Sequence, residues 1–369
     1  MKMNLAIIGA SYLQLPLILK AKEMGYTTHV FAWAADDVGE NEADYFYPIS
    51  IKEKERILEK CIEIGICGIC SIASDLAIVT VNYVAEKLGL NGNSIAATKI
   101  STNKHEMRVT FEKNGDPSPR SYLIDKVTDF SSFDINYPII VKPTDRSGSR
   151  GIRKLTGREG LAEAVKHAIS ESFEKKALIE EFVEGKEYSV EYISFKGQHH
   201  FLAITEKFTT GEPNFVETGH MEPANIDEYL VKKIKSVVEH ALDSLKLENG
   251  ASHSEIKIDN EDNIKIIEIG GRMGGDCIGS DLVRYSTGID YVRAVIQVAC
   301  NEEPDLTPVC ESQAVMVKFL IDEMDMNEFQ KIRKSENDSI LQIVDYHPER
   351  IGKMTDSSNR AGCYIIKIL

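Results

Sequence analysis

Short apolar runs alternate with amphipathic stretches along the first hundred residues of the chain. The apolar run Asn4–Ile8 leads into a turn, and a helical pattern follows over Leu15–Met24. The alternation continues with strand signals at Thr28–Phe31 and Gly68–Ile72 and helix signals at Glu53–Ile64 and Ala77–Leu88. Strands that alternate with helices are typical of a parallel sheet covered on both faces. We therefore predict a doubly wound α/β domain over residues 1–100.

The pattern changes after this first part. Tyr137–Pro143 has the pattern of a short strand, and two further strand-like runs surround the turn Asp259–Asn263, which favours a hairpin. The rest of the chain is expected to contain a helix over Ile289–Cys300 and a small β-rich cap. We expect a second unit to begin near Ser101.

Charge narrows the range of partners. The 369 residues include 43 lysines and arginines against 58 aspartates and glutamates, which gives a net charge of −15. A surface of this sign repels nucleic acids and anionic membranes. We expect neither as a partner, and any anionic ligand has to bind in a local basic pocket.

Signals for a membrane span or for secretion are not expected in this chain. Apolar runs such as Leu5–Ala10 are far shorter than the roughly 20 residues of a membrane-spanning helix. The seven cysteines lack paired metal-ligand spacing, and Cys67–Cys70 lies in a strand-like run, so reduced core thiols are favoured over redox or metal chemistry. We expect a cytoplasmic protein.

A lysine and a glycine-rich loop follow one of the predicted strands. Lys142 ends the strand and precedes Pro143, so its side chain is expected to project at an edge. The loop that follows contains Ser147, Gly148, Ser149 and Gly151. Its backbone N–H groups can close over phosphates. Alone, such a loop is more typical of a flexible hairpin tip, but the preceding lysine shifts the interpretation toward a phosphate site.

Glu255 and Glu268 lie on the two strands of the predicted hairpin. The hairpin brings their carboxylates together, and paired carboxylates with phosphate oxygens make the oxygen-rich shell that Mg²⁺ requires. Beyond Glu268 the chain continues through Arg272 to a glycine-rich turn at Gly275. This order of groups at the end of a strand suits a metal–phosphate site better than a core. Either glutamate alone would be interpreted as an exposed strand residue.

Two features of the N-terminal part remain open to more than one interpretation. Gly9–Tyr12 is a fragment of a dinucleotide-binding motif without its second and third glycines, so a tight turn is favoured over NAD binding. Asp75 follows a strand, where open α/β sheets bind ligands, but it is almost as well placed to cap the next helix.

A further motif lies at the end of another predicted strand, in the order Glu180, Glu181, Phe182 and Val183. Together with it, six motifs between Lys104 and Asp276 occur in the order found in the ATP-grasp superfamily, which the chain resembles. The resemblance implies an ATP-grasp fold, whose α+β nucleotide-binding lobes would follow the doubly wound domain. The small lobe would span residues 101–185, and the C-terminal lobe would span residues 186–369.

The resemblance also implies a role for each motif. Lys104 and Lys142 would bind the phosphates of ATP, covered by the loop that contains Ser147, Gly148, Ser149 and Gly151. The adenine pocket would be lined by Glu180, Glu181, Phe182 and Val183. Glu187 would hold the ribose hydroxyls, and Glu255 and Glu268 would bind Mg²⁺ (or Mn²⁺).

One position departs from the superfamily pattern. Many members carry asparagine two residues after the second metal-binding glutamate, whereas this chain has Gly270, so the second ion would rely on Glu268 or on water. The spacing of Glu268, Arg272 and Gly275 instead resembles that of the L-amino-acid ligases that make dipeptides.

A Glu-x-x-His motif lies upstream in that group, and Glu217 and His220 match it. The resemblance implies that Arg272 and His220 flank an acyl phosphate and offer it positive charge or hydrogen bonds, and that Asp75 and Gly275 contact substrate. A loop histidine beside glycine and proline is equally typical of a solvated or structural residue.

The resemblance implies an ATP- and magnesium-dependent carboxylate–amine ligase that works through an acyl phosphate. Its partners would be a small-molecule carboxylate and a small-molecule amine, and we expect both to be amino acids. The sequence does not decide between a monomer and a homodimer. The alternatives are a purine-pathway or carboxylase-type ATP-grasp enzyme and a nucleotide-binding regulator without catalysis. The presence of Lys104, Lys142, Glu255, Glu268 and Arg272 argues against the regulator.

Overall fold

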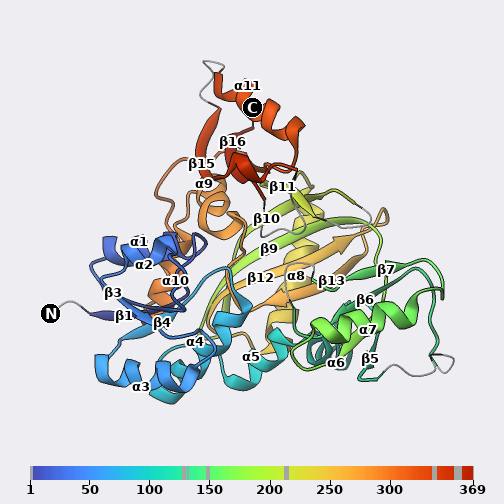
Figure 1. Ribbon diagram of the computed structural model, residues 1–369, viewed down its shortest axis with the longest axis horizontal. Helices are drawn as coiled ribbons and strands as arrows, with labels where there is room; N and C mark the ends of the chain where they lie inside the picture. Colours follow the sequence, from blue (N-terminus) through green and yellow to red (C-terminus); the bar gives the residue numbers. More distant parts are fainter. Residues whose placement is uncertain are drawn as a thin grey trace.

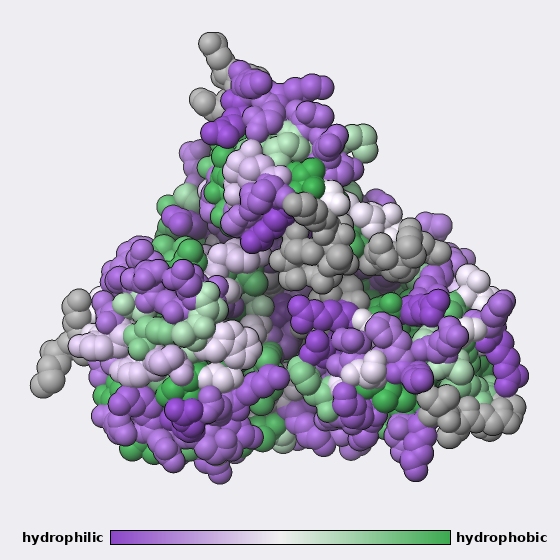
Figure 2. All heavy atoms as spheres, viewed as in Figure 1, coloured by the Kyte–Doolittle hydropathy of each residue, from purple (hydrophilic) through white to green (hydrophobic). Residues whose placement is uncertain are grey.

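The computed structural model describes residues 3–126, 130, 133–146, 150–211, 216–334, 339–352 and 360–368. The chain forms three sheets with helices packed around them (Figure 1). No helix in these ranges is long and apolar enough to cross a membrane. On the face seen in Figure 2, hydrophilic residues cover most of the surface, and the surface is hollowed between the three sheet-containing parts.

The first sheet has the strand order β3-β2-β1-β4, and every pair in it is parallel. The strands are β1 (Asn4–Ile8), β2 (Thr27–Ala32), β3 (Tyr45–Pro48) and β4 (Gly68–Cys70). The apolar residues of α1 (Leu15–Glu23) and α10 (Tyr291–Ala299) cover one face. Those of α3 (Lys54–Ile64) and α4 (Asp75–Leu88) cover the other face, which confirms the doubly wound prediction. The short helix α2 (Val38–Glu42) lies between β2 and β3 in the chain.

Two helices, α5 (Ile95–Thr102) and α6 (Lys104–Asn114), lead from this part into the second sheet. That sheet is antiparallel, in the order β5-β8-β6-β7. Its strands are β5 (Ser121–Ile124), β6 (Ile139–Pro143), β7 (Arg153–Leu155) and β8 (Ala177–Glu181). An apolar core joins the sheet to α7 (Leu161–Glu171).

The third sheet has eight strands in the order β13-β12-β9-β10-β11-β14-β16-β15, all antiparallel. The strands are β9 (Lys186–Phe195), β10 (Gln198–Thr209), β11 (Glu217–Glu222), β12 (Gly250–Ile258), β13 (Ile264–Gly270), β14 (Val315–Phe319), β15 (Ile340–Tyr346) and β16 (Gly362–Lys367). The expected β-rich cap is thus the far end of this sheet, where α11 (Glu323–Lys334) packs against it. The remaining short helices are η2 (Ile278–Leu282), α9 (Val283–Thr287) and η3 (Pro348–Arg350). The residue boundaries of the three expected domains stay a prediction.

Side-chain alternation along β9 separates a core face from a polar face. Tyr188, Val190 and Tyr192 pack into the apolar core formed with α8 (Glu228–Leu245). The residues between them point to the opposite face, because successive side chains on a strand alternate. On that opposite face, glutamates lie near the start of β9. Further along the strand, Ile193 packs into the apolar core that includes residues of α1 and α10. One shared core therefore holds the first sheet against the third.

Glu222 is a buried carboxyl group at the end of β11. Its side chain accepts hydrogen bonds from the hydroxyls of Thr205 (2.6 Å) and Ser286 (2.5 Å). Burial raises the pKa of Glu222 to about 7, although these two hydroxyls act in the opposite direction. The folded state therefore binds this proton more tightly than the unfolded state does.

We expect this carboxyl group to lower the stability of the protein as the pH rises. Because the folded pKa of about 7 lies above the ordinary 4.5, the free energy of unfolding falls between these pH values and is constant above them. The Glu222→Gln variant lacks this titration. Between pH 4 and pH 8, the free energy of unfolding of the variant should therefore rise by up to about 3 kcal/mol relative to that of wild type. Urea unfolding at several pH values measures the difference. An exposed control on α6, Glu112→Gln, should follow wild type, and parallel curves for Glu222→Gln and wild type would contradict the assignment.

Candidate functional site

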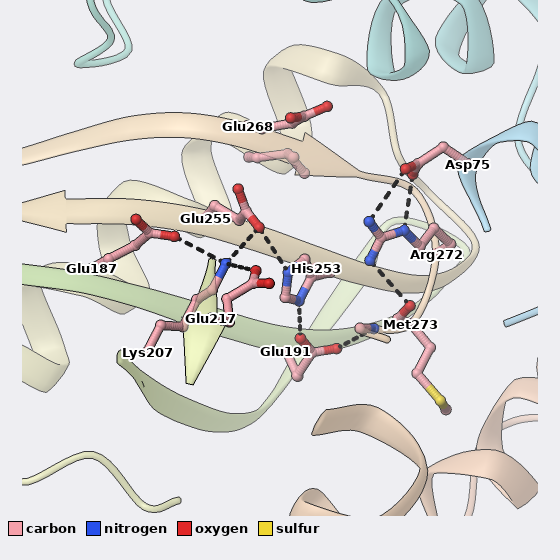
Figure 3. Close-up of polar contacts among 12 residues, drawn as sticks. Asp75, Glu187, Glu191, Lys207, Glu217, His253, Glu255, Glu268, Arg272 and Met273 are labelled. Atoms are coloured by element: carbon pink, nitrogen blue, oxygen red, sulfur yellow. Dashed lines mark hydrogen bonds and ion pairs between the residues drawn. The ribbon is translucent and has the colours of Figure 1, made fainter. Parts of the chain in front are cut away.

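The site lies on the polar face of the third sheet, where strand pairing brings charged residues side by side. Lys207 on β10 is directly opposite Glu187 on β9 and His220 on β11. On the other side of β9, His253 of β12 is opposite Glu191. Residues directly opposite one another on neighbouring strands point to the same face. Figure 3 shows Lys207, Glu187, Glu191 and His253 close together on neighbouring strands, with Arg272 beside them on the turn after β13.

Lys207 is the centre of this polar face. Its Nζ atom lies 2.8 Å from Glu255, 2.9 Å from Glu187 and 3.4 Å from Glu217. Burial acts to lower its pKa, but the Glu255 and Glu187 carboxylates hold the pKa well above the ordinary value. Lys207 is therefore charged and neutralises part of an acidic cluster. The sequence analysis missed Lys207, since the alternating polar residues of β10 do not distinguish it from surface positions.

A second pair, Glu191 and His253, lies beside this cluster and was also missed. Nδ1 of His253 is hydrogen-bonded to Glu191, whose other oxygen accepts the backbone N–H of Gly274 at 3.0 Å. Nε2 of His253 lies 3.5 Å from Glu255. Burial acts to lower the pKa of His253, but Glu191 outweighs it and the pKa is raised. A Cβ atom on Gly274 would lie 2.8 Å from both Glu191 and His253, so the turn needs glycine at this position.

Asp75 and Arg272 form a bidentate ion pair between the start of α4 and the glycine-rich turn. Nε and Nη2 of Arg272 lie 2.9 Å and 3.2 Å from the two carboxylate oxygens of Asp75. Burial acts to raise the pKa of Asp75, but Arg272 lowers it below the ordinary value. The helix cap that the sequence allowed for Asp75 is made by Ser74, whose hydroxyl accepts the N–H of Ala77. The Asp75 carboxylate is free to reach Arg272.

This ion pair also explains the glycine at position 270. A Cβ atom there would lie 2.9 Å from an oxygen of Asp75 and 3.3 Å from Nε of Arg272. The space that an asparagine side chain would need is thus taken by the Asp75–Arg272 pair. At Gly275, a Cβ atom would make only an ordinary 3.5 Å contact with Ala73.

Lys104, the first residue of α6, lies across from the end of β13. Its Nζ atom is 2.6 Å from Glu268 and donates to the backbone oxygen of Arg146 at 2.8 Å. Burial acts to lower its pKa, but Glu268 raises it. Lys104 therefore connects the metal-site candidate with the start of the glycine-rich loop. Of that loop, Ser147, Gly148 and Ser149 lie outside the described residues, and Gly151 has a positive φ of +71°.

Lys142 was expected to project at an edge, and this expectation is wrong. Its strand β6 lies between β8 and β7, and the side chain is buried, with Nζ 2.5 Å from Glu180. Arg108 binds the other oxygen of Glu180 at 3.0 Å. Burial lowers the pKa of Lys142, whereas the two cations keep the pKa of Glu180 low against the effect of burial. The side chain of Glu180 is thus occupied by ion pairs, and its part in an adenine pocket stays a prediction.

The segment after β8 is held by backbone and cation contacts. The N–H of Glu181 donates to the oxygen of Arg120, and that of Phe182 donates to the oxygen of Pro138. Lys257 donates to the oxygen of Val183 at 3.2 Å. The Nζ atom of Lys154 lies 3.8 Å from the centre of the Phe182 ring. A chain segment with fixed backbone and an aromatic ring is able to bind a planar base.

His220 is buried on β11, and its ring meets Phe319 edge to face at 5.3 Å. Burial, helped by the charge of Lys207, lowers the pKa of His220 to about 3. The ring is therefore neutral near pH 7, so of the two roles expected for it, positive charge is wrong and hydrogen bonding remains. Its Nδ1 atom is buried and has no hydrogen-bond partner in the described ranges.

The candidate metal ligands meet as the sequence predicted, because Glu255 and Glu268 are directly opposite each other in the β12–β13 ladder. Among the described residues, no group of three or more His, Cys, Asp or Glu side chains is arranged to hold a metal ion. Mg²⁺ is often bound by only one or two carboxylates together with phosphate oxygens and water. The two glutamates therefore fit a magnesium ion that arrives with a nucleotide.

Comparison with known proteins finds a match to an ATP-grasp domain in the middle of the chain. Residues 135–281 match the ATP-grasp domain family. Alanine–anticapsin ligase of Bacillus subtilis (strain 168) is 28% identical over 301 residues, which are 72% of this chain and 63% of that protein. A D-alanine–D-alanine ligase of Flavobacterium johnsoniae is 30% identical over 173 residues, 44% of this chain and 53% of the relative. This chain thus matches less than two thirds of the length of either relative.

Solved structures extend the likeness to the whole fold. An L-amino acid ligase from Bacillus licheniformis superposes with a TM-score of 0.81 at 22% identity, over 99% of this chain and 93% of that one. A phosphoribosylglycinamide synthetase from Anaerococcus prevotii gives 0.79 at 23% identity, over 100% and 94%. At these identities the likeness is one of fold. Residues 135–281 thus match the ATP-grasp domain family, and the chain as a whole shares its fold with these two enzymes.

Proposed function

We propose that the protein is an ATP- and magnesium-dependent ligase that joins a carboxylate to an amine, with amino acids as substrates. The observation that carries the proposal is the arrangement at the end of β13. There Lys104 contacts Glu268, Glu255 is opposite Glu268, and Arg272 follows on the next turn. A phosphate group needs cations, a metal ion needs carboxylates, and this region offers both within a few side chains.

ATP would bind between the second and third sheets. Its phosphates would contact Lys104 and Lys142, which are already oriented by Glu268 and Glu180. The base would lie against residues 181–183, and Glu187 would accept the ribose hydroxyls. Glu255 and Glu268 would hold Mg²⁺ or Mn²⁺, which supplies positive charge to the phosphate oxygens.

The reaction follows from the poor leaving ability of a carboxylate oxygen. The carboxylate of one substrate attacks the γ-phosphorus of ATP, which gives an acyl phosphate and ADP. The amine of the second substrate then attacks the acyl carbon, and phosphate leaves. Arg272 would stabilise the negative charge on both the transferring group and the tetrahedral oxygen. Neutral His220 would contribute a hydrogen bond, and Glu217 would orient the substrate.

The acyl phosphate would hydrolyse if water reached it. The loop with Ser147, Gly148, Ser149 and Gly151 would exclude water by closing over the phosphates, starting from Arg146, whose backbone oxygen Lys104 holds. Asp75 and Gly275 would contact substrate next to Arg272. We further propose that the protein acts in the cytoplasm.

The amino-acid substrates are supported by relatives named as alanine–anticapsin and D-alanine–D-alanine ligases. A purine-pathway activity has the support of fold likeness alone, as with the phosphoribosylglycinamide synthetase. ADP release from ATP, measured with pairs of L-amino acids, D-alanine, small carboxylic acids and a phosphorylated sugar amine, separates these functions. With carboxylate present and amine absent, hydroxylamine should trap a hydroxamate that depends on ATP. Binding of MgATP without ADP or hydroxamate under any of these conditions would leave a nucleotide-binding regulator.

Glu268→Gln tests the metal site. Glutamine keeps the size of the side chain but removes the charge needed for the metal ion, so we expect ADP release to be lost while the circular dichroism spectrum is unchanged. Glu261→Gln, in the exposed turn of the same hairpin, is the control and should retain activity. ADP release by Glu268→Gln at the wild-type rate would remove this glutamate from the metal site.

Lys142→Ala tests the contact with phosphate. Loss of one charge-assisted hydrogen bond weakens binding by roughly 1.5 to 3 kcal/mol, so the affinity for MgATP should fall at least about 10-fold. Adenosine lacks phosphates and should bind as before. Isothermal titration calorimetry measures both ligands, with Lys166→Ala on the exposed face of α7 as the control. Equal losses for ATP and adenosine would indicate that the Lys142–Glu180 pair serves only the fold.

Arg272→Met and His220→Leu test the chemical step. Removing one hydrogen-bond donor to a developing oxyanion costs about 100- to 1000-fold in turnover, and MgATP affinity should change much less. Single-turnover ADP formation measures the step. Asp75→Asn is the matched comparison, because it disturbs Arg272 without removing it. Equal rates for Asp75→Asn and Arg272→Met would show that Arg272 acts by holding the first sheet in place and not at the reacting atoms.

A further inference from the structure

Arg360, which precedes β16 at the far end of the third sheet, reaches back to the candidate site. Its Nη1 atom lies 2.8 Å from Asp276, and its Nη2 atom lies 2.8 Å from Glu217. Asp276 directly follows the glycine-rich turn, and Glu217 begins β11. One guanidinium group therefore joins three segments that are far apart in the sequence.

The guanidinium group is itself fixed. Its centre lies 3.8 Å from the centre of the Phe319 ring, and only 6% of the residue is exposed. Its Nε atom is buried and has no hydrogen-bond partner among the described residues, so the two Nη atoms carry its contacts with the carboxylates. A planar group that stacks on a ring and donates in two directions holds its partners at a fixed distance and angle.

Both carboxylates need this partner. Asp276 has a φ of +50°, a conformation that costs a non-glycine residue of the order of 1 to 3 kcal/mol and persists only when contacts hold it. Burial acts to raise the pKa of Asp276, but Arg360 lowers it, so the buried group is a charged carboxylate. Among the described residues, Glu217 has one other cation, Lys207, at the longer distance of 3.4 Å. Lys207 also pairs with Glu255 and Glu187, so Arg360 is the partner that Glu217 does not share with them.

We propose that Arg360 is a positioning residue for the amino-acid substrate. It fixes Asp276 and Glu217, which also contacts Lys207, in place, so that their carboxylates can accept the ammonium group of an amino acid. The far end of the third sheet thereby determines substrate affinity without contacting ATP. This inference rests on the proposed ligase function.

The test compares Michaelis constants in variants at position 360. The substrates are ATP and one pair of L-amino acids that supports ADP release by the wild type. Lysine reaches only one of the two carboxylates, so Arg360→Lys should raise the KM for an amino acid roughly 10- to 100-fold, with the KM for ATP unchanged. Arg360→Met should show the same pattern more strongly. A purely structural role would instead reduce the amount of folded enzyme and leave both constants at their wild-type values.

Two further variants keep the test decisive if Arg360→Met does not fold. Phe319→Leu removes the ring beneath the guanidinium group but keeps every charge, and it should raise the amino-acid KM in the same selective way. The double variant Arg360→Met/Asp276→Asn should raise the amino-acid KM by less than the product of the two factors measured in the single variants, because the two residues act as one unit. Arg333→Lys, exposed on α11, is the control and should match wild type.

Unchanged amino-acid KM values in Arg360→Lys and Phe319→Leu, with wild type active, would overturn the inference and leave the proposed function intact. A rise in the ATP KM as large as that for the amino acid would also overturn it. If wild type releases no ADP with any pair of amino acids, D-alanine included, the proposed function itself fails.

Discussion

The fold depends on ion pairs that neutralise the carboxylates buried on one face of the third sheet. Lys207, Arg272, Arg360 and Lys104 each pair with carboxylates from another segment of the chain. A buried charge without a partner costs several kcal/mol, so these pairs fix the segments relative to one another. These pairs also place both positively and negatively charged side chains on this face before any ligand binds. The same contacts that hold the fold together therefore orient the groups that the proposed reaction uses.

Much of the fold could be predicted from local patterns. Alternating apolar runs identified the parallel first sheet, and the turn after β12 identified the hairpin that pairs Glu255 with Glu268. What local patterns could not predict is pairing between distant strands. The third sheet places β14 next to β11 and β16 next to β14, so the expected cap is part of the same sheet as the candidate site.

Only those residues of the candidate site that belong to sequence motifs were predicted. Glu255, Glu268, Lys104 and Arg272 carry distinctive spacing and neighbours, and the structure brings them to one region. Lys207, Glu191 and Arg360 have no such signal, because an ordinary polar residue on a strand becomes part of a site only through its partners. The protonation state of His220 could not be predicted from sequence either, since its neutral form follows from burial and from the charge of Lys207.

Gly270 has a consequence for how related chains can differ. The carboxylate of Asp75, the first residue of α4, occupies the volume that any side chain at position 270 would need. The two positions lie in different parts of the fold but share one space, so neither can change independently. Related chains with asparagine at the equivalent of position 270 should carry a smaller or differently directed residue at the equivalent of Asp75. The identity of one residue at the start of α4 thus limits which metal ligands the last strand of the hairpin can evolve.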